Sequence, residues 1–324
     1  MKILILGGSG FIGQCLARLL QASAEFEIVS ASRRLTSLQQ LPIQYLSLDT
    51  LCQTDLQRAL QGVDCVVNCV AGDAKSIAEG AKILVNAMLT ANCRQLVHLS
   101  SMAVYGGFEG VASETTHLVE QAGWYAMAKC EAEQQVRQFV KQGGSAVIFR
   151  PGCVYGEGSE QWVGRIGRLI RQRRLGDLGI NGDGWSNLIH VDDLCQAIQK
   201  VLTQNCNETL RIYNLAAADS PRWNQYFMDF GLAIAATPLP RVTLRQLKAD
   251  AYFCGPPLKL MQKLAVRLKP TQTSLPDPLP PGLVRYFKQD IKVDAALVTK
   301  QLNLTTMPYA TGLQRSVTWF LSQK

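Results

Sequence analysis

The first half of the chain alternates continuous apolar runs with segments of helical periodicity. Such runs are typical of parallel strands that are buried on both faces, and the helical segments are expected to cover the sheet. The pattern predicts strands at 3–6, 27–31, 43–48, 65–70, 95–99, 146–149 and 210–215. It predicts helices at 10–21, 54–60, 76–91, 121–141 and 192–202. The alternation predicts an α/β fold with a doubly wound parallel sheet, whose ligands bind beyond the carboxyl ends of the strands.

A glycine-rich turn, GGSGFIG, follows the first predicted strand. Gly7 would allow a tight turn, Gly10 would let a diphosphate approach the backbone, and Gly13 would let the next helix pack closely on the sheet. The helix begins near Phe11 and Ile12, where free N–H groups and a partial positive charge favour an anion. Because the motif joins a strand to a helix, it predicts a dinucleotide site in a Rossmann sheet.

The pattern becomes less regular after residue 151. Glycines cluster between residues 152 and 184, and nine prolines lie between residues 238 and 281. We therefore expect residues 1–155 and 190–216 to form the dinucleotide-binding domain. Residues 156–189 and 217–324 are expected to form a smaller, mostly helical substrate domain.

The second predicted strand ends in Ser30-Ala31-Ser32-Arg33-Arg34. An NAD site usually has an acidic residue here, which binds the 2′-hydroxyl of the ribose. This turn has none, and the hydroxyl of Ser32 with the guanidinium of Arg33 could instead bind a 2′-phosphate. The sequence therefore favours NADP over NAD, with a solvated basic turn as the alternative.

A serine-rich strand end and a Tyr-x-x-x-Lys pair suggest acid–base chemistry. Ser101 follows the strand at 95–99, and Tyr125 and Lys129 are four residues apart in a predicted helix, so they share one face. A nearby ammonium lowers a tyrosine pKa that starts near 10. Tyr125 is therefore a candidate acid/base, and a serine hydroxyl could stabilise a substrate oxygen.

With these motifs, the chain resembles the extended short-chain dehydrogenase/reductases, a group that includes nucleotide-sugar epimerases and dehydratases and 3β-hydroxysteroid dehydrogenases. The resemblance covers nearly the whole chain. The matching stretches are GGSGFIG (7–13), VVNCVAG (66–72), VHLSSMAVYG (97–106), YAMAK (125–129), FRPGCVYG (149–156), NGDG (181–184), IHVDDL (189–194) and IYNLA (212–216).

The resemblance implies a role for individual residues. Ser101 would be the catalytic serine, Tyr125 the acid/base, and Lys129 its partner and a ligand of the cofactor ribose. The other expected cofactor contacts are Leu48 and Asp49 beside the adenine, Ala71 facing the cofactor, and Pro151 and Val154 lining the nicotinamide.

Two positions depart from the family pattern. Where members often carry an asparagine in the fourth helix, this chain has Ile77, so a supporting polar group is missing or comes from elsewhere. Where nucleotide-sugar members carry an arginine for the substrate diphosphate, it has Ser186, beside Trp185. The amphipathic segment 251–270 resembles the lid of members that act on steroid-like or flavonoid-like substrates, and an ordinary packing helix is the alternative.

Three functions follow. The first is an NADP-dependent oxidoreductase that moves a hydride between nicotinamide and an alcohol or ketone of a small, rather apolar substrate. The second is a nucleotide-sugar epimerase or dehydratase with bound NAD(P), against which Ser186 argues. The third is a non-catalytic NADP sensor or scaffold, which Ile77 makes conceivable and the Ser101–Tyr125–Lys129 set opposes.

The composition of the chain limits the classes of molecule that it is expected to bind. The net charge is +8, but the basic residues are scattered and show no interleaving with aromatics, which argues against nucleic acid. The densest basic run, 165–174, is expected to be a solvated helix face or a phosphate contact. The ten cysteines form no CxxC pair, and the three histidines have no metal-ligand spacing, so we expect free thiols, no metal and a cytoplasmic location. No apolar stretch is long enough to span a membrane, and the resemblance suggests a homodimer.

The segment IHVDDL contains His190, Asp192 and Asp193. We expect one of the two aspartates to cap the helix at 192–202 and the histidine to be a structural neighbour.

Overall fold

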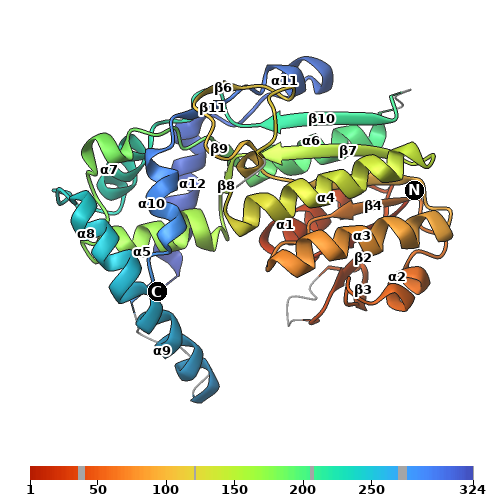
Figure 1. Cartoon of the computed structure of the whole chain (residues 1–324), viewed down its shortest axis with the longest axis horizontal. Helices are drawn as coiled ribbons and strands as arrows, with labels where there is room; N and C mark the ends of the chain where they lie inside the picture. The colour runs from red at the N-terminus through yellow and green to blue at the C-terminus, as the bar shows by residue number, and fades with distance from the viewer. Residues whose placement is uncertain (36–40, 120–121, 205–207, 269–275, 324) are drawn as a thin grey trace.

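A seven-stranded parallel sheet forms the centre of the protein (Figure 1). The computed structural model describes residues 1–35, 41–119, 122–204, 208–268 and 276–323, with the backbone alone for 262–268. The strand order is β10-β7-β5-β4-β1-β2-β3. The strands are β1 (Lys2–Leu6), β2 (Glu27–Ser32), β3 (Gln44–Ser47), β4 (Cys65–Asn68), β5 (Gln95–Leu99), β7 (Ser145–Pro151) and β10 (Leu210–Leu215). The predicted doubly wound Rossmann sheet is confirmed.

Helices cover both faces of this sheet, and each face has its own apolar core. One face is covered by α1 (Phe11–Gln21), α6 (Val191–Thr203) and α11 (Ala296–Leu302). The other is covered by α2 (Gln53–Ala59), α3 (Ala74–Thr90) and α4 (Trp124–Lys141). Strand β1 lies between β2 and β4, so the strand order reverses there and opens a crevice at the carboxyl ends.

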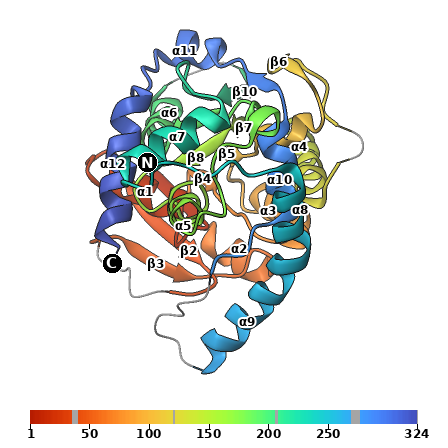
Figure 2. The same ribbon diagram turned by 90° about the vertical axis from the view of Figure 1, so that its left-hand side faces the viewer.

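A third core lies beyond those carboxyl ends and is rich in aromatic side chains. It is built around Trp223, Tyr226, Phe227, Phe230 and Phe287, all of them buried. The helices around it are α5 (Arg165–Arg171), α7 (Trp223–Ala233), α8 (Leu244–Ala249), α10 (Pro281–Lys288) and α12 (Tyr309–Ser322). Helix α9 (Gly255–Leu268) continues from α8 and projects from the body of the protein (Figures 1 and 2).

Two small parallel sheets each pair a strand from the first half of the chain with a strand from the second half. Strand β6 (Gly110–Ala112) pairs with β11 (Ile291–Val293), and β8 (Cys153–Tyr155) pairs with β9 (Leu188–His190). The remaining elements are 3₁₀ turns at Met102–Tyr105 and Gly179–Gly182 and π-helical segments at Glu160–Gly164 and Asp250–Cys254. In the described part of the chain, no helix has both the length and the apolar character needed to cross a membrane.

Several element ends differ from the predicted ones for local reasons. The strand predicted at 65–70 ends at Asn68, because the Asn68 side chain accepts a hydrogen bond from the N–H of Val70 (3.1 Å) and turns the chain. The helix predicted at 121–141 starts at Trp124, after Gly123, and residues 120–121 lie outside the described part. The predicted aspartate cap of α6 is wrong: the side chain of His190 caps the helix by accepting from the N–H of Asp192 (3.3 Å).

Candidate active site

The glycine turn between β1 and α1 has no room for side chains at its ends. Gly7 has a positive φ of 77°, and a Cβ there would lie 3.0 Å from the backbone of Cys69. A Cβ on Gly13 would lie 2.4 Å from the carbonyl oxygen of Gly7. Gly8, to which sequence reasoning gave no role, would place a Cβ 2.1 Å from the hydroxyl of Ser30. The turn is therefore a tight backbone cradle.

The start of α1 fits a dinucleotide diphosphate. Its N-cap is Gly10, and no side chain caps the free N–H groups of Phe11 and Ile12 in the first turn. A Cβ on Gly10 would meet only the Gly7 carbonyl, at 3.1 Å, so the surroundings of Gly10 are otherwise open. Uncapped N–H groups at the positive end of a helix dipole can bind an anion. The backbone present here therefore fits the group that the motif predicts.

The residues predicted to contact the adenosine half lie at the ends of β2 and β3. The hydroxyl of Ser32 donates to the carbonyl of Arg34 (2.8 Å), and the Arg33 side chain is exposed. The N–H of Leu48 donates to the carbonyl of Ser32 (3.0 Å), which holds the two strand ends together. Leu48 is buried and Asp49 is exposed. The Arg33 guanidinium, the Ser32 hydroxyl and the apolar side chain of Leu48 thus lie along one edge of the sheet.

An acidic residue that sequence reasoning missed lies near this edge. Asp73 caps α3 by accepting from the N–H of Ser76 (2.8 Å). That hydrogen bond lowers the pKa of the Asp73 carboxyl, and Arg33 adds a smaller lowering. Asp73 follows β4 and Arg33 follows β2, so both residues lie at the carboxyl-end edge of the sheet. The sequence signal for this cap was the position of Asp73 just before the helix, because aspartate is a common N-cap residue.

The other predicted cofactor residues lie at the same edge. Ala71 is exposed in the turn between β4 and α3. Pro151 is the buried last residue of β7, and Val154 is a half-buried residue of β8. Since the strands are parallel, these positions follow the carboxyl ends of β4 and β7, as the glycine turn follows that of β1.

The fold brings Ser101, Tyr125 and Lys129 together. Ser101 lies just after β5, and Tyr125 and Lys129 lie in the first turns of α4. The hydroxyls of Ser101 and Tyr125 are hydrogen-bonded. The Lys129 ammonium donates to the carbonyl of Leu99 (2.7 Å) and lies 6.0 Å from the centre of the Tyr125 ring. A proton donor, a hydroxyl and a cation therefore share one small site.

Burial shifts the proton affinities of this group. Burial raises the pKa of Tyr125, and the hydrogen bond with Ser101 opposes the rise. The Tyr-x-x-x-Lys spacing predicts a lowered pKa for Tyr125. In the folded protein, the rise in this pKa that burial causes is larger. Burial lowers the pKa of Lys129 to about 8, while Cys69 and Glu133 raise it. A lysine with such a pKa can change its protonation state near neutral pH.

A buried ion pair fixes α4 on the sheet. The Arg150 guanidinium binds both carboxylate oxygens of Glu133, at 2.9 Å and 2.7 Å. Both side chains are buried, and Glu133 lies one turn after Lys129. Burial alone would lower the pKa of Arg150, but the Glu133 carboxylate and the Tyr105 hydroxyl raise it above its usual value. Sequence reasoning missed this pair, although the four-residue spacing from Tyr125 to Lys129 to Glu133 marks one helix face.

Ile77 packs between α3 and α4. It is buried with Ala81, Ala128 and Ala132, next to Tyr125. Polar side chains occur instead at the ends of β4 and β5, where the amide of Asn68 lies 3.3 Å from Nδ1 of His98. Burial, with a smaller effect of Lys129, lowers the pKa of His98 to about 3, so this ring is neutral.

An apolar wall, formed by Cys153, Trp162 and Tyr286, belongs to the aromatic core. The pKa of Tyr286 rises well above its usual value through burial, with smaller raising effects of Cys153 and Tyr125. The ring of Trp162 lies 5.9 Å from that of Tyr286. Sequence reasoning missed this wall, because α10 and the π-helical segment carry no motif that connects them to Tyr125.

Ser186 cannot offer the cation that nucleotide-sugar members have at this position. Its hydroxyl is buried and donates to the carbonyl of Pro221 (2.6 Å). The neighbouring Trp185 has two cations on its ring, with Arg222 at 4.5 Å and Lys292 at 4.7 Å. The local fold thus uses Ser186 for internal hydrogen bonding.

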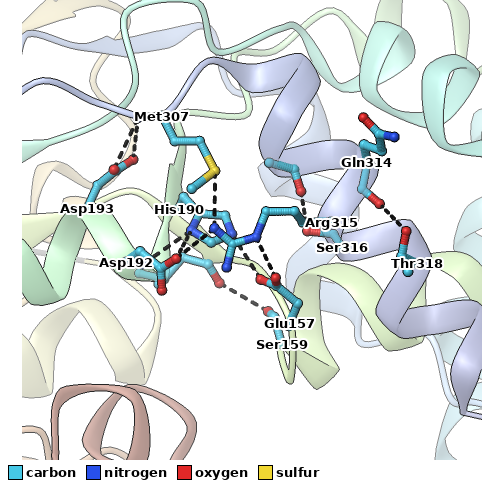
Figure 3. Close-up of polar contacts among 12 residues, drawn as sticks. Glu157, Ser159, His190, Asp192, Asp193, Met307, Gln314, Arg315, Ser316 and Thr318 are labelled. Carbon is cyan, nitrogen blue, oxygen red and sulfur yellow. Dashed lines mark hydrogen bonds and ion pairs between the residues drawn. The ribbon is translucent and has the colours of Figure 1, made fainter. Parts of the chain in front are cut away.

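His190 belongs to a group of ion pairs with α12 (Figure 3). Arg315 donates to Glu157 (2.6 Å) and lies 2.9 Å from the carboxylate of Asp192. Nε2 of His190 lies 3.2 Å from Glu157. Burial lowers the pKa of His190, although both carboxylates raise it. These contacts connect α12 to the start of α6 and support the interpretation of His190 as a structural neighbour.

The basic run 165–174 is largely paired within the protein. Arg168 binds Asp277 and Glu160, and Arg174 binds Asp250 (2.8 Å). The Arg171 guanidinium lies 4.5 Å from the centre of the Phe320 ring. These contacts favour neither of the two interpretations made from the sequence, because the cations connect elements of the second half.

Comparisons with known proteins agree on one family for this chain. Residues 3–216 match the model of the NAD dependent epimerase/dehydratase family. The chain is 28% identical over 216 residues to 2-alkyl-3-oxoalkanoate reductase from Stenotrophomonas maltophilia, a match that covers 61% of this chain and 64% of the relative. It is 25% identical over 218 residues to UDP-glucose 4-epimerase from Vibrio cholerae, covering 61% and 65%. Both matches thus span less than two thirds of the relative.

Solved structures share the fold over the full length. A UDP-glucuronic acid 4-epimerase from Bacillus cereus superposes with a TM-score of 0.75, 17% identity and complete coverage of both chains. A dTDP-glucose 4,6-dehydratase from Bacillus anthracis has a TM-score of 0.75 and 18% identity, and covers 100% of this chain and 97% of its own. With the family match, these findings show that the chain belongs to the NAD dependent epimerase/dehydratase family, whose members are enzymes of the short-chain dehydrogenase/reductase superfamily.

Proposed function

We propose that the protein is an NADP-dependent oxidoreductase that moves a hydride between nicotinamide and an alcohol or ketone of a small, rather apolar substrate. The observation that carries this proposal is the group of Ser101, Tyr125 and Lys129 at the carboxyl end of β5. The apolar wall of Cys153, Trp162 and Tyr286 supports an apolar substrate. The resemblance to an oxoalkanoate reductase is in line with a ketone.

In the direction of reduction, the bound nicotinamide would supply the hydride. Tyr125 would donate its proton to the substrate oxygen, and the Ser101 hydroxyl would stabilise that oxygen by a hydrogen bond. The Lys129 ammonium, oriented by the carbonyl of Leu99, would stabilise the phenolate left on Tyr125. The proton would return to Tyr125 from solvent. Glu133 and Arg150 would keep α4 in position during these steps.

Preference for NADP over NAD rests on Arg33 and Ser32. The exposed Arg33 side chain and the hydroxyl of Ser32 lie at the end of β2, where a 2′-phosphate would be bound. Family membership supports NAD(P) in general. If the preference is right, Arg33→Ala should weaken NADPH binding by about tenfold and leave NADH binding nearly unchanged, since one charge-assisted contact contributes about 1.5 kcal/mol.

A nucleotide-sugar epimerase or dehydratase is the second candidate, and the comparisons support it at least as well. The solved structures include a UDP-glucuronic acid 4-epimerase in complex with UDP-glucuronic acid and NAD. In such a reaction the hydride would return to the same substrate. The buried, internally bonded Ser186 argues against this candidate, because it leaves the diphosphate without the usual arginine. A non-catalytic sensor is not favoured in a family of enzymes.

A reducing, cytoplasmic compartment and a homodimer are also proposals. Every described cysteine is free, as expected where thiols stay reduced. Helices α3 and α4 would form the dimer interface by analogy with the family.

The proposal is tested by Tyr125→Phe. The variant keeps the ring but loses the proton, so kcat should fall by about 10²- to 10⁴-fold. NADPH affinity, measured by fluorescence titration, should stay within about twofold of the wild-type value, because the hydroxyl adds little to cofactor binding. Retained turnover would contradict the role of Tyr125.

A further inference from the structure

Helix α9 leaves the body of the protein at Gly255. A Cβ at this position would lie 3.0 Å from the carbonyl oxygen of Leu279, so glycine permits the close contact. Pro256 and Pro257 follow and lack the N–H groups of a regular helix, which explains the π-helical segment at Asp250–Cys254 just before them. Beyond this point α9 extends away from the other helices in both views (Figures 1 and 2).

The base of this projection exposes large apolar side chains. Tyr252 is 57% exposed, Phe253 78%, Leu260 60% and Met261 49%. Leu260 and Met261 are adjacent on α9, and Tyr252 and Phe253 lie in the π-helical segment that leads into it. Exposed apolar residues that occur singly need no explanation, but a contiguous patch marks an interaction site. The two interpretations made from the sequence, a substrate lid and an ordinary packing helix, stay predictions.

The surroundings of this patch are positively charged. The exposed cations are Arg245 and Lys248 on α8, Lys259 on α9, and Arg285 and Lys288 on α10, which packs against α8. Within the described residues none of them takes part in an ion pair. The nearby acids Asp250 and Asp277 are neutralised by Arg174 and Arg168. The sequence of α9 has three basic residues and no acidic one.

We propose that the α8–α9 arm, residues 244–268, binds the surface of an anionic membrane. Interfacial helices combine exposed aromatic and aliphatic residues with cations that attract acidic headgroups. A second copy of the chain fits less well, since a twofold interface would bring like charges together and interface cores are depleted in lysine. No described helix is able to span a bilayer, so the contact would be with the surface.

The test is co-sedimentation of the full chain with vesicles. Vesicles of phosphatidylcholine with 30% phosphatidylglycerol, a composition chosen as roughly that of an anionic membrane, should bind the protein at least about tenfold more strongly than pure phosphatidylcholine. Lys248→Gln and Lys259→Gln should each weaken binding by about fivefold. Raising the salt to about 0.5 M should weaken it further, through screening.

The apolar contribution is tested by the double variant Phe253→Ser, Leu260→Ser, which keeps the net charge. Its vesicle binding should fall at least about tenfold. The matched controls Ile180→Ser and Leu232→Ser remove equally exposed side chains outside the arm, 77% and 67% exposed, and should bind as the wild type does. Absence of vesicle binding by the wild type would overturn the proposal, as would unchanged binding by the double variant.

Two other outcomes would assign the arm a different role. If light scattering shows that the double variant turns a dimer into a monomer, and the wild type does not bind vesicles, the patch contacts a second copy. If the double variant changes the KM for ketones in the absence of lipid, and the wild type does not bind vesicles, the arm covers the substrate. Either result would overturn membrane binding without affecting the proposed reaction.

Discussion

Helices α4 and α9 distribute their side chains in opposite ways. Helix α4 buries two charged residues, Lys129 and Glu133, whereas α9 exposes two large apolar ones, Leu260 and Met261. Burying a charge is costly unless partners compensate it, and each charge of α4 has one: the carbonyl of Leu99 and the guanidinium of Arg150. Exposed apolar surface has no such compensation within the protein. Helix α4 is thus suited to the interior of the protein, and the described part of α9 is suited to a contact with another surface.

The buried pair gives the largest expected effect. Glu133→Ala would leave the buried Arg150 without its counter-ion, so the free energy of unfolding should fall by about 3–5 kcal/mol. Urea denaturation measures this change. The control is Arg137→Ala, which removes a 40% exposed cation 3.9 Å from Glu133 and should cost less than about 1 kcal/mol. Equal effects of the two substitutions would contradict the distinction between buried and exposed pairs.

Lys129 gives an intermediate effect that depends on pH. Burial lowers its pKa in the folded protein from 10.5 to about 8, so between these pH values the unfolded chain binds more protons than the folded one. The unfolding free energy should therefore rise with pH in this window, by about 3 kcal/mol relative to Lys129→Met. The rise should be complete above pH 10.5 and absent below pH 8. A constant difference between wild type and variant would show that Lys129 does not titrate there.

Helix α9 gives the smallest expected effect on stability. The double variant Phe253→Ser, Leu260→Ser removes side chains that lack burial, so the thermal midpoint and the free energy of unfolding should stay within about 0.5 kcal/mol of wild type. Differential scanning calorimetry without lipid is the measurement. A loss of more than about 2 kcal/mol would mean that α9 packs on the protein in solution, which would remove its contrast with α4.

Local patterns were sufficient to predict much of the fold and part of the site. The glycine turn, the parallel strands and the Tyr125–Lys129 pair are each encoded in a few consecutive residues with a defined period. Ser101 could be chosen over Ser100 only through the family resemblance, because both serines follow the same strand. The fold and the family are confirmed, whereas the roles of these site residues stay predictions.

What sequence reasoning missed depends on contacts between distant segments. The partner of Glu133 is Arg150, on a strand that packs under α4 only in the folded protein. Tyr286, from the last quarter of the chain, joins Cys153 and Trp162 in the apolar wall. The cap of α6 is His190, because the histidine occupies the N-cap position, whereas both aspartates lie inside the first turn of the helix. Such choices follow from tertiary packing, which no local period encodes.

The central claim is net hydride transfer to a ketone, and deuterium labelling tests it most directly. The protein would be incubated with NADPH carrying deuterium at both C4 positions of the nicotinamide, together with a 2-alkyl-3-oxo acid or UDP-glucose, and the products analysed by mass spectrometry. The account predicts an alcohol with one deuterium on the carbinol carbon for each NADP⁺ formed. Interconversion of the UDP-sugar without consumption of NADPH, and without deuterium in any alcohol, would contradict it.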